Sequence, residues 1–139
     1  MSDERKIQRV EKLLAVSQAQ ERAAQQAFDL AKAAADDVQA KIIECERAMI
    51  ERHEQFRQHL AGGTLNDLAG GYRDGVSSLR RQIAHLTAVR KLADSHLEDR
   101  RADLLAAMTR RRAAEIARER LAARQAAAQG RRETRLLDE

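Results

Sequence analysis

Apolar residues recur at alternating intervals of three and four along residues 4–60. Counted from Ile7 in these steps, twelve of sixteen positions are apolar, without a break over eight heptads. A buried helix of a globular protein rarely keeps so strict a 3.5-residue period, so the pattern indicates a coiled coil with these positions on its seam, the line where two helices meet. Four polar exceptions are predicted to weaken the seam locally and to fix its register: Ser17, Glu21, Arg52 and His59.

Glycines mark the end of this helix. Residues 4–60 contain neither Gly nor Pro, whereas Gly62-Gly63 follows directly, as Gly does just beyond a helix C-terminus. The segment from Thr64 to Asp67 fits an N-cap with an acidic residue three positions later, which predicts a short helical turn before Gly70-Gly71 breaks it. Residues 61–71 are therefore predicted to form the tip of a hairpin.

A second apolar stripe runs from Tyr72 to Ala128, ahead of Gly130. Between these ends its members are Val76, Leu79, Ile83, Leu86, Val89 or Ala93, Leu97, Leu104, Met108, Ala114 or Ile116, and Leu121. A short tip makes the two helices antiparallel neighbours. On that geometry Phe56 lies near Leu79, Phe28 near Leu104 and Met108, and Leu14 near Leu121.

The predicted fold class is therefore all-α, a long antiparallel two-helix coiled-coil hairpin. It forms a single domain over residues 1–139. The first helix covers about 4–60, the tip 61–71, the second helix about 72–130, and a basic C-terminal tail 131–139.

Composition excludes several other classes of protein. The 139 residues include three aromatic residues, no Pro, no Trp and one Cys, whereas β-folds need aromatic residues and turns and disulfide scaffolds need Cys pairs. The apolar runs are far shorter than the about 18 residues of a membrane span. The first four residues also lack the apolar stretch of a signal peptide, so we expect a cytoplasmic protein.

The net charge of +4 is concentrated in the last part of the chain. Residues 100–139 carry 11 basic and 6 acidic side chains, against 10 and 11 in residues 1–60 and 5 of each in residues 61–99. This basic segment has three possible interpretations. It is a solvated helix that pairs with acidic residues of the first helix, or a docking surface for an acidic partner, or a surface for nucleic acid. No zinc-finger spacing, aromatic platform or recognition-helix turn is present, so nucleic acid is not an expected partner.

Residues able to carry chemistry are scattered. Cys45 falls on the seam, where a lone Cys usually acts as a small hydrophobic residue. The four His form no Glu-x-x-His or His-Glu-x-x-His motif, and the glycine pairs lack the Lys-Ser/Thr of a phosphate loop. Acidic pairs such as Asp36-Asp37 lie on a helix surface with no pocket to desolvate them. We therefore expect no enzyme activity, no metal and no cofactor.

Several features follow one another in a characteristic order. Ile7 to Val10 opens the heptads, and Glu54 to Leu60 ends the first helix with an aromatic residue and a Leu. A Gly-containing tip follows, Tyr72 to Ile83 starts the second helix with a Tyr…Leu…Ile spacing, and Arg131 to Glu139 is a basic run. In this order the chain resembles the stalk proteins of flagellar and type III secretion export ATPases, the FliJ-like family with its injectisome counterparts of the YscO/SctO type.

The resemblance implies a non-enzymatic protein similar to the γ-subunit shaft of rotary ATPases. The open end of the hairpin would dock in the pore of a hexameric export ATPase. The residues expected there are Ile7, Val10, Leu14, Arg118, Leu121 and Arg124.

The other end would contact the cytosolic domain of the membrane export gate, so the protein would sit at the cytoplasmic face of the inner membrane and reach the membrane only through the gate. The resemblance also implies contact with export chaperones. The residues expected at the gate are Met49, Arg52, Phe56, Tyr72, Leu79 and Leu86.

Two alternatives stand beside the stalk: a generic coiled-coil scaffold or adaptor, and a less favoured basic hairpin that binds nucleic acid. Oligomeric state separates the stalk from the scaffold. A stalk that meets a sixfold ring is expected to be a monomer, whereas a generic coiled coil more often closes its seam by dimerising. Sedimentation equilibrium is therefore expected to give one species of 15.6 kDa. A dimer that forms with rising concentration would favour the scaffold.

Overall fold

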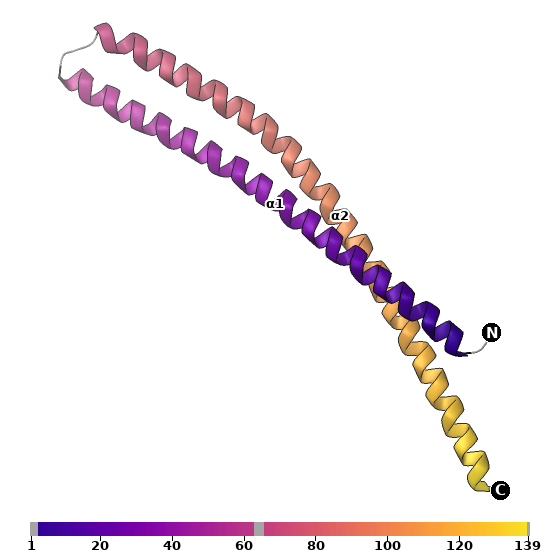
Figure 1. Ribbon diagram of the computed structural model, residues 1–139. Helices are drawn as coiled ribbons and strands as arrows, with labels where there is room; N and C mark the ends of the chain where they lie inside the picture. The colour runs from indigo at the N-terminus through magenta and orange to yellow at the C-terminus, as the bar shows by residue number, and fades with distance from the viewer. Residues whose placement is uncertain (1–2, 63–65, 139) are drawn as a thin grey trace. The chain divides into compact units, whose positions relative to one another are not determined.

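The computed structural model describes residues 3–62 and 66–138. Helix α1 spans Asp3–Ala61 and helix α2 spans Asn66–Asp138, and the described residues contain no strand (Figure 1). The two helices pack against each other, which confirms the predicted all-α, antiparallel two-helix coiled-coil hairpin.

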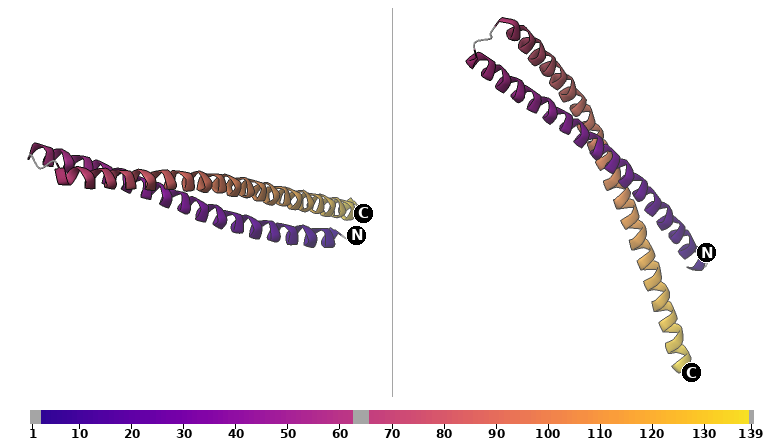
Figure 2. Two further views of the ribbon diagram at one scale, coloured as in Figure 1. Left: turned by 90° about the horizontal axis from the view of Figure 1, so that it is seen from above. Right: turned by 60° about the vertical axis from the view of Figure 1, so that its left-hand side comes forward.

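Contacts divide the chain into two compact units. Unit 1 combines Met1–Phe28 with Arg100–Glu139, and unit 2 is Asp29–Asp99. Each unit therefore contains one segment of α1 and one segment of α2, packed side by side (Figure 2). The prediction of a single domain over the whole chain stays a prediction.

Cross-helix contacts show the antiparallel direction within each unit. In unit 1, Glu11 of α1 lies near Arg118 of α2, and the later residue Glu21 contacts the earlier residue Arg111. In unit 2, Cys45 of α1 contacts Gln82 of α2, and the later residue Phe56 contacts the earlier residue Tyr72. Residue numbers on one helix thus fall while those on the other rise.

The seam on α1 follows the predicted heptad positions. Every predicted position from Ile7 to Met49 is buried or half-buried, and so is Phe56, whereas Arg52 and His59 are exposed. The most deeply buried members of the seam are small or medium-sized: Leu14, Ser17, Ala31, Ala35 and Ile42 on α1, and Val76, Ala107 and Ala114 on α2. Small side chains let the two helices approach closely.

The seam on α2 differs from the predicted stripe between Leu104 and Ala114. Ala107 is 1% exposed, whereas Met108 is 39% exposed and lies beside the seam. Steps of three and four from Leu104 lead to Ala107, Arg111 and Ala114, so the heptad spacing and not the size of the side chain decides which residue is buried. The placement of Met108 on the seam is therefore wrong.

Helix α2 begins earlier and ends later than predicted. It starts at Asn66 instead of Tyr72, continues through Gly70-Gly71 and Gly130, and ends at Asp138. Helix α2 therefore includes part of the predicted tip and continues through the basic C-terminal tail as far as Asp138. A Gly inside a helix costs only about 1 kcal/mol relative to Ala, which the flanking turns of a long helix outweigh.

The first glycine after α1 acts as expected. The Gly62 N–H donates to the carbonyl oxygens of Gln58 at 3.2 Å and His59 at 3.1 Å, which satisfies acceptors in the last turn of α1. Gly63, and Thr64 and Leu65 of the expected N-cap, lie outside the described residues.

The early start of α2 changes the pairing near the tip. The ring of Phe56 stacks on Tyr72 with centroids 4.2 Å apart. Leu79, the predicted neighbour of Phe56, lies seven residues further along α2, about 10 Å away at the rise of an α-helix. The pairing predicted for Phe56 is therefore wrong, because a shorter connection returns the chain sooner.

Replacement of Gly71 by Ala is expected to raise the free energy of unfolding by up to about 1 kcal/mol, because Ala is the better helix former. A Cβ at Gly71 would meet no atom within 4 Å, and the same holds for Gly130, whose replacement by Ala is a second test. Urea unfolding followed by circular dichroism measures the change. A loss of stability at Gly71 would indicate a left-handed turn and would contradict the continuous helix.

Candidate functional site

Three rings gather between the helices near the tip of unit 2. The planes of Phe56 and Tyr72 are 10° apart, and His53 meets the Tyr72 ring edge-on with centroids 5.5 Å apart. The Tyr72 hydroxyl and His53 Nδ1 also share a hydrogen bond. These contacts join the last turns of α1 to the early turns of α2, so the rings have a packing role of their own.

Most residues expected at the export gate belong to the contact between the helices. Met49, Phe56, Tyr72, Leu79 and Leu86 are half-buried, and Arg52 is exposed. A partner can therefore reach only the outer edges of the five half-buried side chains while the two helices stay paired.

Arg52 occupies a seam position but places its charge at the surface. A Cβ at Gly75 would overlap the Arg52 guanidinium group, so this side chain lies directly against the backbone of α2. The missing side chain at Gly75 provides the space. The guanidinium group of Arg52 thus covers the seam beside Gly75, while the residue as a whole stays exposed.

A charged pair interrupts the seam of unit 1. Arg111 Nε donates to Glu21 Oε2 at 2.6 Å, and Arg111 Nη1 donates to both carboxylate oxygens of Glu115 at 3.0 Å. Arg112 adds a contact to Glu115 at 3.3 Å. The hydrogen bond to Glu21 is the main cause that raises the pKa of Arg111, and the hydrogen bond from Arg111 is the main cause that lowers the pKa of Glu115.

This pair supports the prediction that Glu21 fixes the register. A shift of one helix along the other would place Glu21 and Arg111 against apolar seam residues without each other. A half-buried charge that loses its partner destabilises the fold, so the pair favours the one register in which both charges meet.

The residues expected at the ATPase pore fall into two groups. Leu14 is buried and Ile7, Val10 and Leu121 are half-buried, so these four belong to the helix pair. Arg118 and Arg124 are exposed, and the Arg118 guanidinium lies 3.9 Å from a carboxylate oxygen of Glu11. Of the six residues expected at the pore, only the two arginines are therefore exposed.

Exposed apolar residues on the sides of unit 1 were missed by the sequence analysis. Leu13 and Val16 are 55% and 53% exposed on α1, and Leu105 is 58% exposed on α2. The adjacent pair Leu13-Leu14 is the signal that could have found them, because only one of two neighbouring residues can face the seam.

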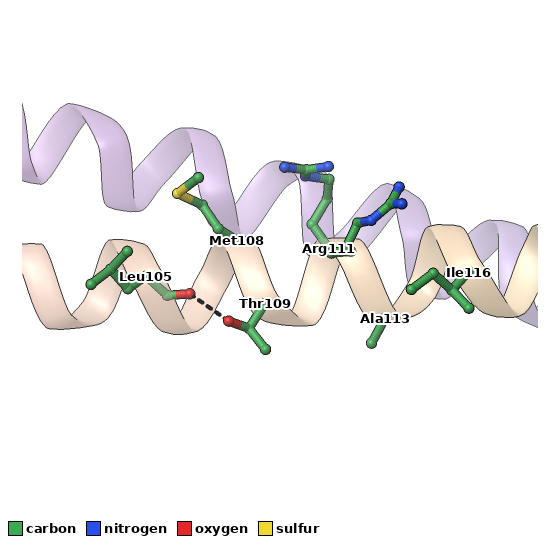
Figure 3. A pocket seen from close by; sticks show the side chains of 7 residues that line it. Leu105, Met108, Thr109, Arg111, Ala113 and Ile116 are labelled. Atoms are coloured by element: carbon green, nitrogen blue, oxygen red, sulfur yellow. Dashed lines mark hydrogen bonds between the residues drawn. The ribbon is translucent and has the colours of Figure 1, made fainter.

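One of these residues lines a shallow hollow on α2. Leu105, Ala113 and Ile116 lie on one side of the helix, while Met108 and Arg111 lie on the side nearer α1 (Figure 3). The Thr109 hydroxyl donates to the carbonyl oxygen of Leu105 at 2.9 Å. The hollow has a volume of about 520 Å³ and is wide open.

Cys45 is half-buried, and its thiol donates to Gln82 Oε1 across the helices at 3.5 Å. This contact fits the expected role of Cys45 as a seam residue. Within residues 3–62 and 66–138, no three His, Cys, Asp or Glu side chains are grouped as a metal site would require. Neither α1 nor α2, as far as the structure describes them, has a stretch long and apolar enough to cross a membrane.

The fold is thus a two-helix coiled coil in which most residues are exposed. The model of the flagellar FliJ protein family matches residues 6–139, and the chain belongs to this family. FliJ proteins are non-enzymatic components of flagellar protein export, which gives this chain an export-related role in flagellum biogenesis. Comparisons with curated proteins and with solved structures found no match.

Replacement of Glu115 by Gln is expected to lower the melting temperature at neutral pH and to have little effect in acid. The pKa of Glu115 is lowered in the folded chain, so its ionised form stabilises the fold above the ordinary pKa range of Glu, and this contribution disappears as the pH falls through the lowered pKa. Thermal unfolding of both proteins between neutral and acidic pH measures the difference. Glu119→Gln, an exposed position one turn further on, is the control and should show no such pH dependence.

Proposed function

We propose that this protein is the central stalk of a type III protein-export apparatus, which links a hexameric export ATPase to the membrane export gate. The observation that carries the proposal is the FliJ family match over residues 6–139, in a chain that folds as two paired helices. The family provides the role in export, and the helix pair provides two ends with different surface chemistry.

In this proposal unit 1 docks in the pore of the ATPase. Its α2 segment holds the basic surplus of the chain, with 11 basic and 6 acidic side chains in residues 100–139. Arg118 and Arg124 are exposed and can meet acidic groups of a ring. Ile7, Val10 and Leu121 offer their outer edges, and the buried Leu14 holds the two helices together behind them.

The tip of unit 2 contacts the cytosolic domain of the gate in the same proposal. Arg52 offers an exposed charge, and the half-buried Met49, Phe56, Tyr72, Leu79 and Leu86 form the surface around it. Ile50 and Leu60, which are 67% and 42% exposed, add apolar area on α1. The protein then works at the cytoplasmic face of the inner membrane, and export chaperones are further partners.

The rate of ATP hydrolysis by the export ATPase of the same genome, measured against added protein, tests the proposal. Stimulation is expected to saturate at about one chain per six ATPase subunits, because one stalk serves one closed ring. Arg118→Glu combined with Arg124→Glu should weaken the stimulation about tenfold or more, since each change replaces attraction by repulsion.

Arg73→Glu combined with Arg80→Glu is the matched control. It makes the same change in net charge at exposed positions of unit 2, and stimulation should stay as in the unaltered protein. The stalk proposal fails if the unaltered protein neither binds nor stimulates the ATPase. An equal loss in both double variants would show that total charge, and not docking by unit 1, controls the ATPase.

A further inference from the structure

A groove of about 440 Å³ runs between α1 and α2 along one side of unit 1. This flank groove is lined on α1 by Leu13, Val16 and Gln20, and on α2 by Arg110, Ala113 and Ala117. Leu13 and Val16 are more than half exposed, so two large aliphatic side chains face water beside two alanines. Such a surface gains free energy when another apolar surface covers it.

The spacing of the lining residues suits a helix as the covering element. Leu13 and Gln20 on α1, and Arg110 and Ala117 on α2, are each one heptad apart. Lining residues therefore repeat every two helical turns along both walls, and the small side chains on α2 leave room for another backbone. A third helix in a coiled coil packs between positions of this kind.

Basic side chains border the flank groove toward the chain ends. Lys6 and Arg9 stand one heptad before Leu13 and Val16, and Arg120 and Arg124 stand one heptad after Ala113 and Ala117. Seven residues are almost two full turns, so each of these cations shares the side of its helix with a groove residue. All four are exposed.

These cations, together with Arg110 in the groove, make no ion pair within the part of the chain that the structure describes. The acidic residue on this side of α2, Asp103, lies one heptad before Arg110 and pairs with Arg100 at 3.2 Å. The positive charge around the groove is thus left for a partner.

On the opposite side of unit 1, charged side chains have partners within the chain. A groove there of about 470 Å³ includes Glu115, Arg118 and Glu119 in its lining. Glu115 is paired with Arg111 and Arg112, and Arg118 lies near Glu11. Glu115 and Arg118 on that side thus have partners of opposite charge inside the chain, which distinguishes the flank groove from a general basic surface.

We propose that the flank groove binds an acidic amphipathic helix of another protein. The apolar side of that helix would cover Leu13 and Val16, and its carboxylates would meet the surrounding cations. A second copy of unit 1 fits poorly, because it would bring the same cations face to face. A nucleic-acid backbone would satisfy the cations but leave the aliphatic floor uncovered. The proposal goes beyond the stalk function and does not depend on it.

Fluorescence anisotropy with a designed peptide tests the groove. The probe is a labelled three-heptad helix with Leu on one side and Glu on the other, and a second peptide carries Lys in place of Glu. The full chain is expected to bind the Glu peptide, and the Lys peptide about tenfold more weakly or less. Added salt should weaken binding of the Glu peptide, because the charge pairs are exposed.

Two pairs of variants locate the binding. Val16→Glu places a charge in the groove, while Leu137→Glu makes the same kind of change at an exposed apolar residue of unit 1 away from it, with 53% and 86% exposure respectively. Arg110→Glu reverses a groove charge, and Arg135→Glu is its control. Each groove variant is expected to bind about tenfold more weakly, and each control within about twofold of the unaltered chain. Circular dichroism checks that helicity is kept.

The proposal is overturned if the full chain does not bind the Glu peptide, if the Glu and Lys peptides bind equally, or if Val16→Glu and Leu137→Glu lose affinity equally. A dimer that Val16→Glu abolishes in sedimentation would also overturn it, because a second copy would then cover the groove. The peptide assay contains no ATPase, so its failure leaves the stalk proposal standing, and a failed ATPase assay leaves the groove standing.

Discussion

Contact along one narrow seam holds the two helices of this protein together. Several of its most buried members are alanines, namely Ala31, Ala35, Ala107 and Ala114, and the larger ones are Leu14, Ile42 and Val76. Each buried CH₂ contributes only about 0.8 kcal/mol, so a seam rich in Ala gains little from burial. The high helix propensity of Ala and Arg supports the helices themselves, and the seam mainly decides how they pair.

The pairing in turn decides which side chains form the surfaces. In unit 1 the contact between Glu21 and Arg111 favours a single register, because the half-buried Glu21 would lose its partner in another. In that register Leu13 and Val16 lie beside Ala113 and Ala117, and an open groove results. The surface that a partner meets therefore depends on a charged pair in the seam.

The same seam also determines how much of this FliJ family member faces outward. Because the contact line is thin, most of the described residues of each helix are exposed. Unit 2 places aromatic side chains between the helices near the tip, and both units keep aliphatic side chains on the outside.

The heptad repeat by itself determined the fold class and the buried side of α1 from Ile7 to Met49. The glycine at 62 determined the end of that helix, and each of these features depends on residues near one another in the chain. The order of features that resembles the FliJ family was also visible in the sequence. Tertiary structure decided that α2 runs through Gly70-Gly71, because the small local cost of Gly yields to the long helix around it. It also decided that Phe56 meets Tyr72, that Arg111 meets Glu21, and that the groove beside Leu13 stays open. The heptad spacing indicates which side of one helix is buried. Which residue of the other helix it meets depends on the length of the connection between the helices and on their register.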